Sequence, residues 1–235
     1  MKTISIIIPV YNEKNTIEKV LKDVLKADSL SLAKEIIVID DCSTDGTETV
    51  LSKYKNNHKV KVIKNSQNIG KGASLKLGFM HSKGDIVLIQ DADLEYSPNE
   101  YPLLIKPIIE GYADVVYGSR FTTSNPHRVL YFYHFIANKF VTTLSNLFTN
   151  LNMTDIETGY KAFRGDIIRT LAPLLVSKRF GIEVEITARI AKIPNIKIYE
   201  VGISYFGRTY QEGKKITWWD GVKTVFEIVR YNLLP

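Results

Sequence analysis

The stretch Asp85-Ile86-Val87-Leu88-Ile89-Gln90-Asp91-Ala92-Asp93 sets the expectation for the fold class of this chain. Its middle is short, apolar and β-branched and lies between Lys83-Gly84 and Ser97-Pro98, which is typical of a buried strand in a parallel sheet. Ligands bind open α/β sheets at the carboxyl ends of the strands, where Asp91 and Asp93 stand. Two hard oxygen donors one residue apart can chelate a divalent cation that also grips phosphate. The alternative is an acidic pair that is simply solvated in a turn.

Strand and helix patterns alternate along the first half of the chain. Strand patterns cover residues 3–9, 35–39, 60–63 and 113–117, and helical apolar spacing begins near residues 17, 47, 73 and 103. This alternation predicts an α/β fold with a doubly wound, mostly parallel sheet and helices on both faces. A further strand is predicted at residues 196–204.

The composition bounds the setting of the chain. Its 235 residues are 45% hydrophobic and 24% charged, which is an ordinary globular composition with enough apolar residues for one sizeable core. Cys42 is the single cysteine and no leader-like segment precedes the first strand, so a reducing, cytoplasmic setting is expected. No run of about 20 uninterrupted apolar residues occurs, so any membrane contact should be peripheral, at the cytoplasmic membrane face.

The net charge of +6 is unevenly distributed. Residues 1–119 carry 15 Lys and Arg against 16 Asp and Glu, whereas residues 120–235 carry 16 against 9. A basic second half suits a phosphate-bearing partner or an anionic membrane face, and equally a merely soluble basic surface. No nucleic-acid partner is expected.

Two further loops follow predicted strands. In Asp40-Asp41-Cys42-Ser43-Thr44-Asp45-Gly46-Thr47, we expect Asp41 to contact a ligand and Asp45 and Thr47 to serve the turn. Asn68-Ile69-Gly70-Lys71-Gly72 can offer backbone N–H groups and a lysine to a phosphate, or its glycines can only turn the chain. The first loop, Pro9-Val10-Tyr11-Asn12-Glu13, lacks the glycines of a dinucleotide fingerprint, which disfavours a nicotinamide enzyme.

Together these motifs resemble the family 2 glycosyltransferases of the GT-A fold, in particular the dolichol-phosphate mannose synthase-like branch that makes polyprenyl-phosphate sugars. The landmarks also include Gly118-Ser119-Arg120, Asp155-Ile156-Glu157-Thr158-Gly159-Tyr160-Lys161 and the stretch from Tyr205 to Lys215. The resemblance covers nearly the whole chain. It implies a single GT-A catalytic domain, residues 1–235, with a nucleotide-sugar-binding half (1–120) and an acceptor-binding half (121–235).

The resemblance also implies roles for individual residues on the donor side. The nucleotide pocket would be lined by Pro9, Tyr11, Glu13, Asp41 and Lys71, with Asp41 at the base or ribose. Mg²⁺ or Mn²⁺ would be held by Asp91, Asp93 and Glu95. Arg208 would reach the donor diphosphate.

On the acceptor side, the resemblance implies that Arg120 and Arg128 face an acceptor phosphate and that Asp155 shapes the pocket floor. The expected catalytic residues are therefore Asp93, Arg208 and Asp155. Two departures from relatives, Cys42 for glycine and Gly159 for cysteine, touch no expected ligand. Many relatives continue into transmembrane helices, whereas this sequence ends at Pro235, a difference that would favour a saccharide or polymer acceptor. A membrane partner subunit that covers the apolar stripe of residues 217–233 is an alternative to peripheral membrane contact.

Two amphipathic stretches lie in the second half. Residues 129–154 are aromatic-rich with Lys139 as their one formal charge, and residues 217–233 carry an apolar stripe opposite charged residues. Each fits either a core helix or a helix at the water–lipid boundary. Between them, residues 207–215 are expected to form a loop that closes over the donor.

The hypothesis that follows is metal-dependent, inverting transfer of a sugar from a UDP- or GDP-sugar to a polyprenyl or dolichyl phosphate. One alternative is transfer to a saccharide or polymer hydroxyl in cell-surface polysaccharide synthesis, which would need a carboxylate base such as Glu157 or Asp155. Another is a nucleotide-sugar-binding protein without turnover. The sequence does not distinguish which sugar or base is bound.

Overall fold

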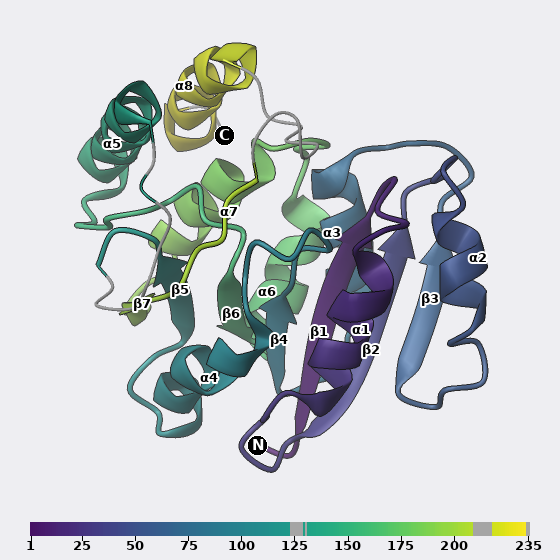
Figure 1. Ribbon diagram of the computed structural model, residues 1–235. Helices are drawn as coiled ribbons and strands as arrows, with labels where there is room; N and C mark the ends of the chain where they lie inside the picture. Colours follow the sequence, from purple (N-terminus) through teal and green to yellow (C-terminus); the bar gives the residue numbers. More distant parts are fainter. Residues whose placement is uncertain (123–128, 130, 209–217, 234–235) are drawn as a thin grey trace.

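The computed structural model describes residues 1–122, 129, 131–208 and 218–233 (Figure 1). In these parts of the chain, helices and strands alternate through the first half, as the sequence predicts. The elements are β1 Thr3–Val10, α1 Ile17–Lys26, β2 Ala33–Asp40, α2 Thr47–Ser52, β3 Val60–Lys64, α3 Lys71–His81, β4 Ile86–Ile89, η1 Pro98–Glu100, α4 Tyr101–Ile109, β5 Val115–Ser119, α5 Phe132–Thr149, β6 Lys161–Arg164, α6 Gly165–Leu171, η2 Ala172–Leu174, α7 Ile182–Ala191, β7 Ile198–Gly202 and α8 Trp218–Leu233.

The strands form one seven-stranded sheet in the order β3-β2-β1-β4-β6-β5-β7. Pairs β1–β2, β2–β3, β1–β4 and β5–β7 are parallel, and β6 runs antiparallel to both of its neighbours. The predicted mostly parallel sheet is thus confirmed. Strand β6 is not predictable from the sequence, because four residues with a charged residue at each end show neither alternation nor an apolar run.

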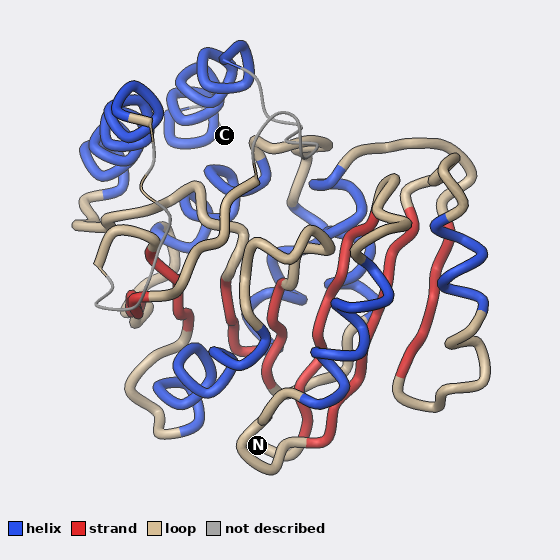
Figure 2. The backbone as a smooth tube through the Cα atoms, in the orientation of Figure 1, coloured by secondary structure: helices blue, strands red, loops and turns tan. Residues whose placement is uncertain are grey.

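Helices cover both faces of the sheet (Figures 1 and 2). Helices α1, α2 and α4 pack on one face over alternate strand residues such as Ile6, Val38 and Leu88. Helices α3, α5, α6, α7 and α8 cover the other face, over residues such as Ile7 and Phe163. Because successive side chains of a strand point to opposite faces, β1, β2 and β4 contribute apolar residues to both cores.

The strand register brings the predicted site loops to one edge. Val10 pairs with Asp40, and Ile7 pairs with Ile89 in the neighbouring strand, so β1, β2 and β4 end close together. The loops that follow these strands therefore meet at the carboxyl edge of the sheet. This is the edge at which open α/β sheets bind ligands.

The two amphipathic stretches form helices that pack on each other and on α7 (Figure 1). α5 buries Val141, Thr142 and Ser145, and α8 buries Ile228 and Tyr231. Other apolar side chains of both helices are exposed, so each helix has a core face and an outer apolar face. Within the described residues, no helix combines the length and the hydrophobicity needed to cross a bilayer.

Candidate active site

Asp91 leaves the end of β4 and forms an ion pair with Lys71, the first residue of α3. The Lys71 Nζ atom lies 2.9 Å from Asp91 Oδ1 and 3.0 Å from Oδ2, and 3.3 Å from Glu183 Oε1 on α7. Burial opposes the charge of Lys71, but the two carboxylates prevail and raise its pKa well above the ordinary value. The Lys71 side chain therefore stays positively charged at the predicted site.

Asp93 lies next to Arg208, which follows β7. Arg208 donates from both terminal nitrogens to Glu13, at 3.2 Å and 3.0 Å, and its Nη2 lies 3.4 Å from Asp93 Oδ2. The Glu95 carboxylate accepts hydrogen bonds from the Arg208 backbone N–H at 2.8 Å and from the Tyr205 hydroxyl at 3.1 Å. The structure thus brings together four predicted site residues, Glu13, Asp93, Glu95 and Arg208, from three separate parts of the sequence.

The acidic pair has the electrostatics of a cation site. Burial, followed by the charges of Asp91 and Glu95, raises the pKa of Asp93 to about 7, although Arg208 acts in the opposite direction. A cation bound between Asp91 and Asp93 would remove this repulsion, and Mg²⁺ commonly binds through one or two carboxylates plus substrate phosphates. The residues present therefore fit a divalent cation.

The third predicted metal ligand points elsewhere. In the described ranges, no three His, Cys, Asp or Glu side chains converge as a ligand cluster. Glu95 directs its carboxylate to Tyr205 and Arg208, and it holds the start of the segment after β7 beside the site. Its place as a metal ligand stays a prediction.

Asp41 organises the loop before α3. It is 3% exposed, and its carboxylate accepts hydrogen bonds from Asn65 Nδ2 and from the backbone N–H groups of Ile69 and Gly70, at 2.8–2.9 Å. The two amides that the sequence offered to a phosphate are therefore bound by Asp41. Its contact with a base or ribose stays a prediction.

Asp45 and Thr47 serve the turn, in agreement with the sequence interpretation. The Asp45 carboxylate accepts hydrogen bonds from the Thr47 backbone N–H at 2.9 Å and hydroxyl at 2.6 Å. Thr47 in turn accepts a hydrogen bond from the Glu13 backbone N–H at 3.0 Å. These contacts connect the loop after β2 to the loop after β1. Pro9 lies near the end of β1, and Tyr11 follows in the loop with an exposed side chain.

On the predicted acceptor side, Arg120 and Asp155 form a buried ion pair. The fully buried Asp155 carboxylate accepts from Arg120 Nε at 2.6 Å, from Nη2 at 2.7 Å and from the backbone N–H at 3.1 Å. The guanidinium stacks on the rings of Tyr205 and Phe121, 5.2 and 5.7 Å from their centroids. Burial opposes the charge of Arg120, but Asp155 raises its pKa above the ordinary value. Arg128 lies outside the described residues.

Some residues at the site gave no signal in the sequence. Glu183 sits in an ordinary helical pattern and reaches Lys71 only through the packing of α7 against α3. Tyr96 belongs to no recognisable sequence motif, yet it stacks on Tyr160 and accepts a hydrogen bond from the Gly159 backbone N–H at 3.2 Å. A Cβ atom on Gly159 would lie 2.3 Å from Asp91 Oδ2, so glycine leaves room for the acidic pair. The expectation that this departure from relatives touches no expected ligand is therefore wrong for Gly159.

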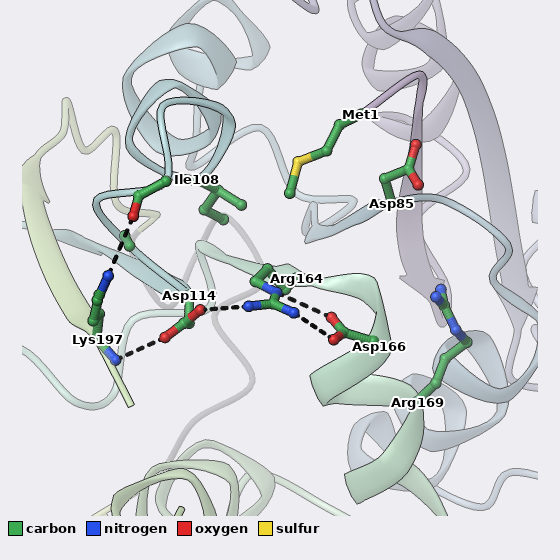
Figure 3. Close-up of a pocket in the computed structure, with 10 residues that line it drawn as sticks. Met1, Asp85, Ile108, Asp114, Arg164, Asp166, Arg169 and Lys197 are labelled. Atoms are coloured by element: carbon green, nitrogen blue, oxygen red, sulfur yellow. Dashed lines mark hydrogen bonds and ion pairs between the residues drawn. The ribbon is translucent and has the colours of Figure 1, made fainter. Parts of the chain in front are cut away.

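A cavity of about 360 Å³ lies at the opposite, amino end of β4 (Figure 3). Arg164 lies in it between Asp114 and Asp166, at 2.9 and 2.6 Å, and Lys197 lines it as well. None of the predicted site residues lines this cavity. The candidate active site is therefore the carboxyl edge of the sheet.

Solved structures with this architecture are GT-A glycosyltransferases. Glucosyl-3-phosphoglycerate synthase from Mycobacterium tuberculosis, in complex with Mn²⁺, UDP and phosphoglyceric acid, superposes with a TM-score of 0.74. The match covers 100% of this chain and 80% of that chain at 20% sequence identity, a level that shows the fold alone. The GT-A fold predicted from the sequence is confirmed.

The family is shown by sequence. The model of the family described as "Glycosyl transferase family 2" matches residues 5–172, so the chain belongs to glycosyl transferase family 2.

Three curated relatives extend this result. The chain is 33% identical, over 73% of its length, to undecaprenyl-phosphate 4-deoxy-4-formamido-L-arabinose transferase from Salmonella choleraesuis, and 30% identical over 72% to that from Edwardsiella ictaluri. It is 26% identical, over 97% of its length, to dolichol-phosphate mannosyltransferase from Pyrococcus furiosus. The chain spans 51% of each of the first two relatives and 62% of the third.

Proposed function

We propose that this chain acts as an inverting, metal-dependent glycosyltransferase that moves a sugar from a UDP- or GDP-sugar to the phosphate of a polyprenyl or dolichyl lipid. The observation that carries the proposal is the arrangement at one sheet edge. Arg208 lies beside Asp93 of the acidic pair, where it would meet the donor, and Arg120 is held by Asp155, where it would meet the acceptor. The names of the three curated relatives support a lipid-phosphate acceptor.

On the donor side, Asp91 and Asp93 would hold Mg²⁺ or Mn²⁺, which when bound supplies positive charge to the departing diphosphate. Arg208 would bind the same diphosphate in a bidentate manner, a geometry that its two hydrogen bonds to Glu13 already display. When the donor binds, its diphosphate would then replace the Glu13 carboxylate as the partner of Arg208. Pro9, Tyr11 and Asp41 would contact the nucleotide.

On the acceptor side, the chemistry needs orientation more than proton removal. A phosphomonoester has a second pKa near 6, so its oxygens are already largely ionised at neutral pH. Arg120 is rigidly placed because Asp155 binds two of its nitrogens and two aromatic rings flank it. It would hold the acceptor phosphate for in-line attack, which inverts the anomeric centre.

The exposed apolar side chains of α5 and α8 support contact with a lipid surface. We name this the α5/α8 surface, and it comprises Phe132, Tyr133, Ile136, Phe140, Leu147, Val222, Phe226, Val229 and Leu233. The exposed Lys139, Lys223 and Arg230 lie on the same two helices and complement anionic headgroups. Such contact would bring the active site to an acceptor that resides in the membrane.

A hydroxyl acceptor is the second candidate. It would need a general base, and Asp155 is bound to Arg120, which leaves Glu157. Burial raises the pKa of the Glu157 carboxyl, a change that strengthens a base. Analysis of the product therefore distinguishes the two acceptor classes. A lipid-linked sugar phosphate indicates a lipid-phosphate acceptor, and a glycoside indicates a hydroxyl acceptor.

The direct test is transfer of labelled sugar from UDP- and GDP-sugars to short polyprenyl phosphates, with and without EDTA. We expect an acid-labile lipid product that disappears in chelator and in Asp93→Ala. A glycosidic product would indicate the second candidate, and full activity in EDTA would refute the metal requirement. Donor binding without transfer or hydrolysis would indicate a binding protein.

The membrane contact has its own test. We expect Phe140→Glu and Phe226→Glu to reduce co-sedimentation with vesicles that contain anionic lipid. Tyr112→Glu is the matched control, because Tyr112 is as exposed as Phe140 (60% and 58%) but lies beyond α4, outside the α5/α8 surface. Equal vesicle binding by all three variants and the wild type would contradict the contact.

A further inference from the structure

A row of alternating charges runs inward from the acidic pair. Asp91 contacts Lys71, Lys71 contacts Glu183, and Glu183 contacts Lys161, whose side chain is fully buried. Lys161 also donates to the backbone carbonyls of Ile156 and Thr158. Each charge in the row therefore faces opposite charges, and Glu183 lies between the two lysines.

The two oxygens of Glu183 are used unequally. Oε2 accepts a hydrogen bond from Lys161. Oε1 is buried and accepts no hydrogen bond, and its contact with Lys71 is an ion pair at 3.3 Å. A buried carboxylate oxygen without a hydrogen bond is costly, so this one offers Lys71 an acceptor position that is not yet filled.

Lys71 and a divalent cation would compete for the same oxygens. Lys71 Nζ lies within hydrogen-bond distance of both carboxylate oxygens of Asp91. A cation that binds Asp91 would repel the Lys71 ammonium group from these oxygens. The Lys71 side chain is only 20% exposed, so its ammonium group would then need another anionic partner nearby.

We infer that Glu183 is a positioning residue for the cation site, because it receives Lys71 when Asp91 binds a metal ion. This inference rests on the proposed role of Asp91 in metal binding. Glu183 would not touch the metal or the substrate. It would lower the cost of freeing Asp91, since its Oε1 atom gains the hydrogen bond that the structure lacks.

The test measures Mn²⁺ binding to the full chain without nucleotide, through the electron paramagnetic resonance signal of free Mn²⁺. We expect Glu183→Gln to raise the Mn²⁺ dissociation constant about tenfold, within the usual range of coupling between sites. Glu183→Asp keeps the charge beside Lys161 but withdraws the carboxylate from Lys71, so it should also weaken Mn²⁺ binding. Glu185→Gln is the matched control, because Glu185 lies on the same helix and contacts Arg189 and the backbone of 176–177 instead.

Lys71→Met separates the proposed contact from long-range charge. In this background no ammonium group at position 71 needs an anionic partner, so Glu183→Asp should leave the Mn²⁺ dissociation constant unchanged. An equal effect of Glu183→Asp in both backgrounds, or no effect in the wild-type background, overturns the inference while the cation site stands. Absence of Mn²⁺ binding by the wild type and by Lys71→Met overturns the cation site itself. Thermal unfolding shows which variants fold. If Glu183→Gln does not fold, the comparison of Glu183→Asp in the two backgrounds tests the inference.

Discussion

Replacement of Asp155 by asparagine should be strongly destabilising. Asp155 is fully buried, and its carboxylate binds Arg120 through three hydrogen bonds of 2.6–3.1 Å. Asparagine keeps the size of the side chain but removes the charge, so the guanidinium is left buried without its counter-ion. Loss of one partner from a buried ion pair typically costs about 3–5 kcal/mol.

Thermal or urea unfolding measures this cost. At about 2–4 °C per kcal/mol for a chain of this size, Asp155→Asn should lower Tm by about 6–20 °C. The control is Asp166→Asn, which breaks an ion pair with Arg164 whose side chains are 41% and 62% exposed. That pair should contribute no more than about 1 kcal/mol. Equal destabilisation by the two substitutions would refute the view that burial makes the Arg120–Asp155 pair important.

Two further predictions concern the same edge of the sheet. Gly159→Ala should weaken Mn²⁺-dependent UDP or GDP binding at least about tenfold, because its Cβ atom would displace Asp91. Gly221→Ala, which has open space around it, is the control in the same calorimetric titration. Unchanged nucleotide affinity would contradict the close approach. Glu157→Gln should raise Tm near neutral pH: burial raises the pKa of Glu157 in the folded state, so its charge destabilises the fold above that pKa and has no effect below the ordinary value of 4.5. A Tm gain that persists below about pH 4 would refute this cause.

The sheet edge was predictable because its signals are local. The run before Asp91 is apolar and short, and Asp41 directly follows β2, so strand ends and site loops could be placed by chain position alone. The parallel register then brings these loops together without any further information. Arg208 was placed at the site only through the family resemblance, since the spacing around it carries no such signal.

The electrostatic partners of the site were not predictable from the sequence. Lys71 and Glu183 are 112 residues apart, and they meet because α3 and α7 pack on the same face of the sheet. Asp41 shows a related limit: its position after a strand suggested a ligand contact, but no sequence signal indicated that its carboxylate would accept hydrogen bonds from the loop 65–70. Strand-end position predicts where a side chain lies, but the packing of distant elements decides what it binds.

The donor side therefore consists of charged groups that already have partners within the chain. Asp91 binds Lys71, and Asp93 and Glu13 bind Arg208, so a cation and a diphosphate would enter by exchange of partners and not by filling unpaired charges. Such an arrangement avoids the cost of unpaired buried charge in the absence of ligand. It would also make the binding of cation and diphosphate mutually dependent, because a metal ion would draw Asp91 away from Lys71 while a diphosphate would draw Arg208 away from Asp93. We therefore expect neither ligand alone to bind as tightly as it does in the presence of the other.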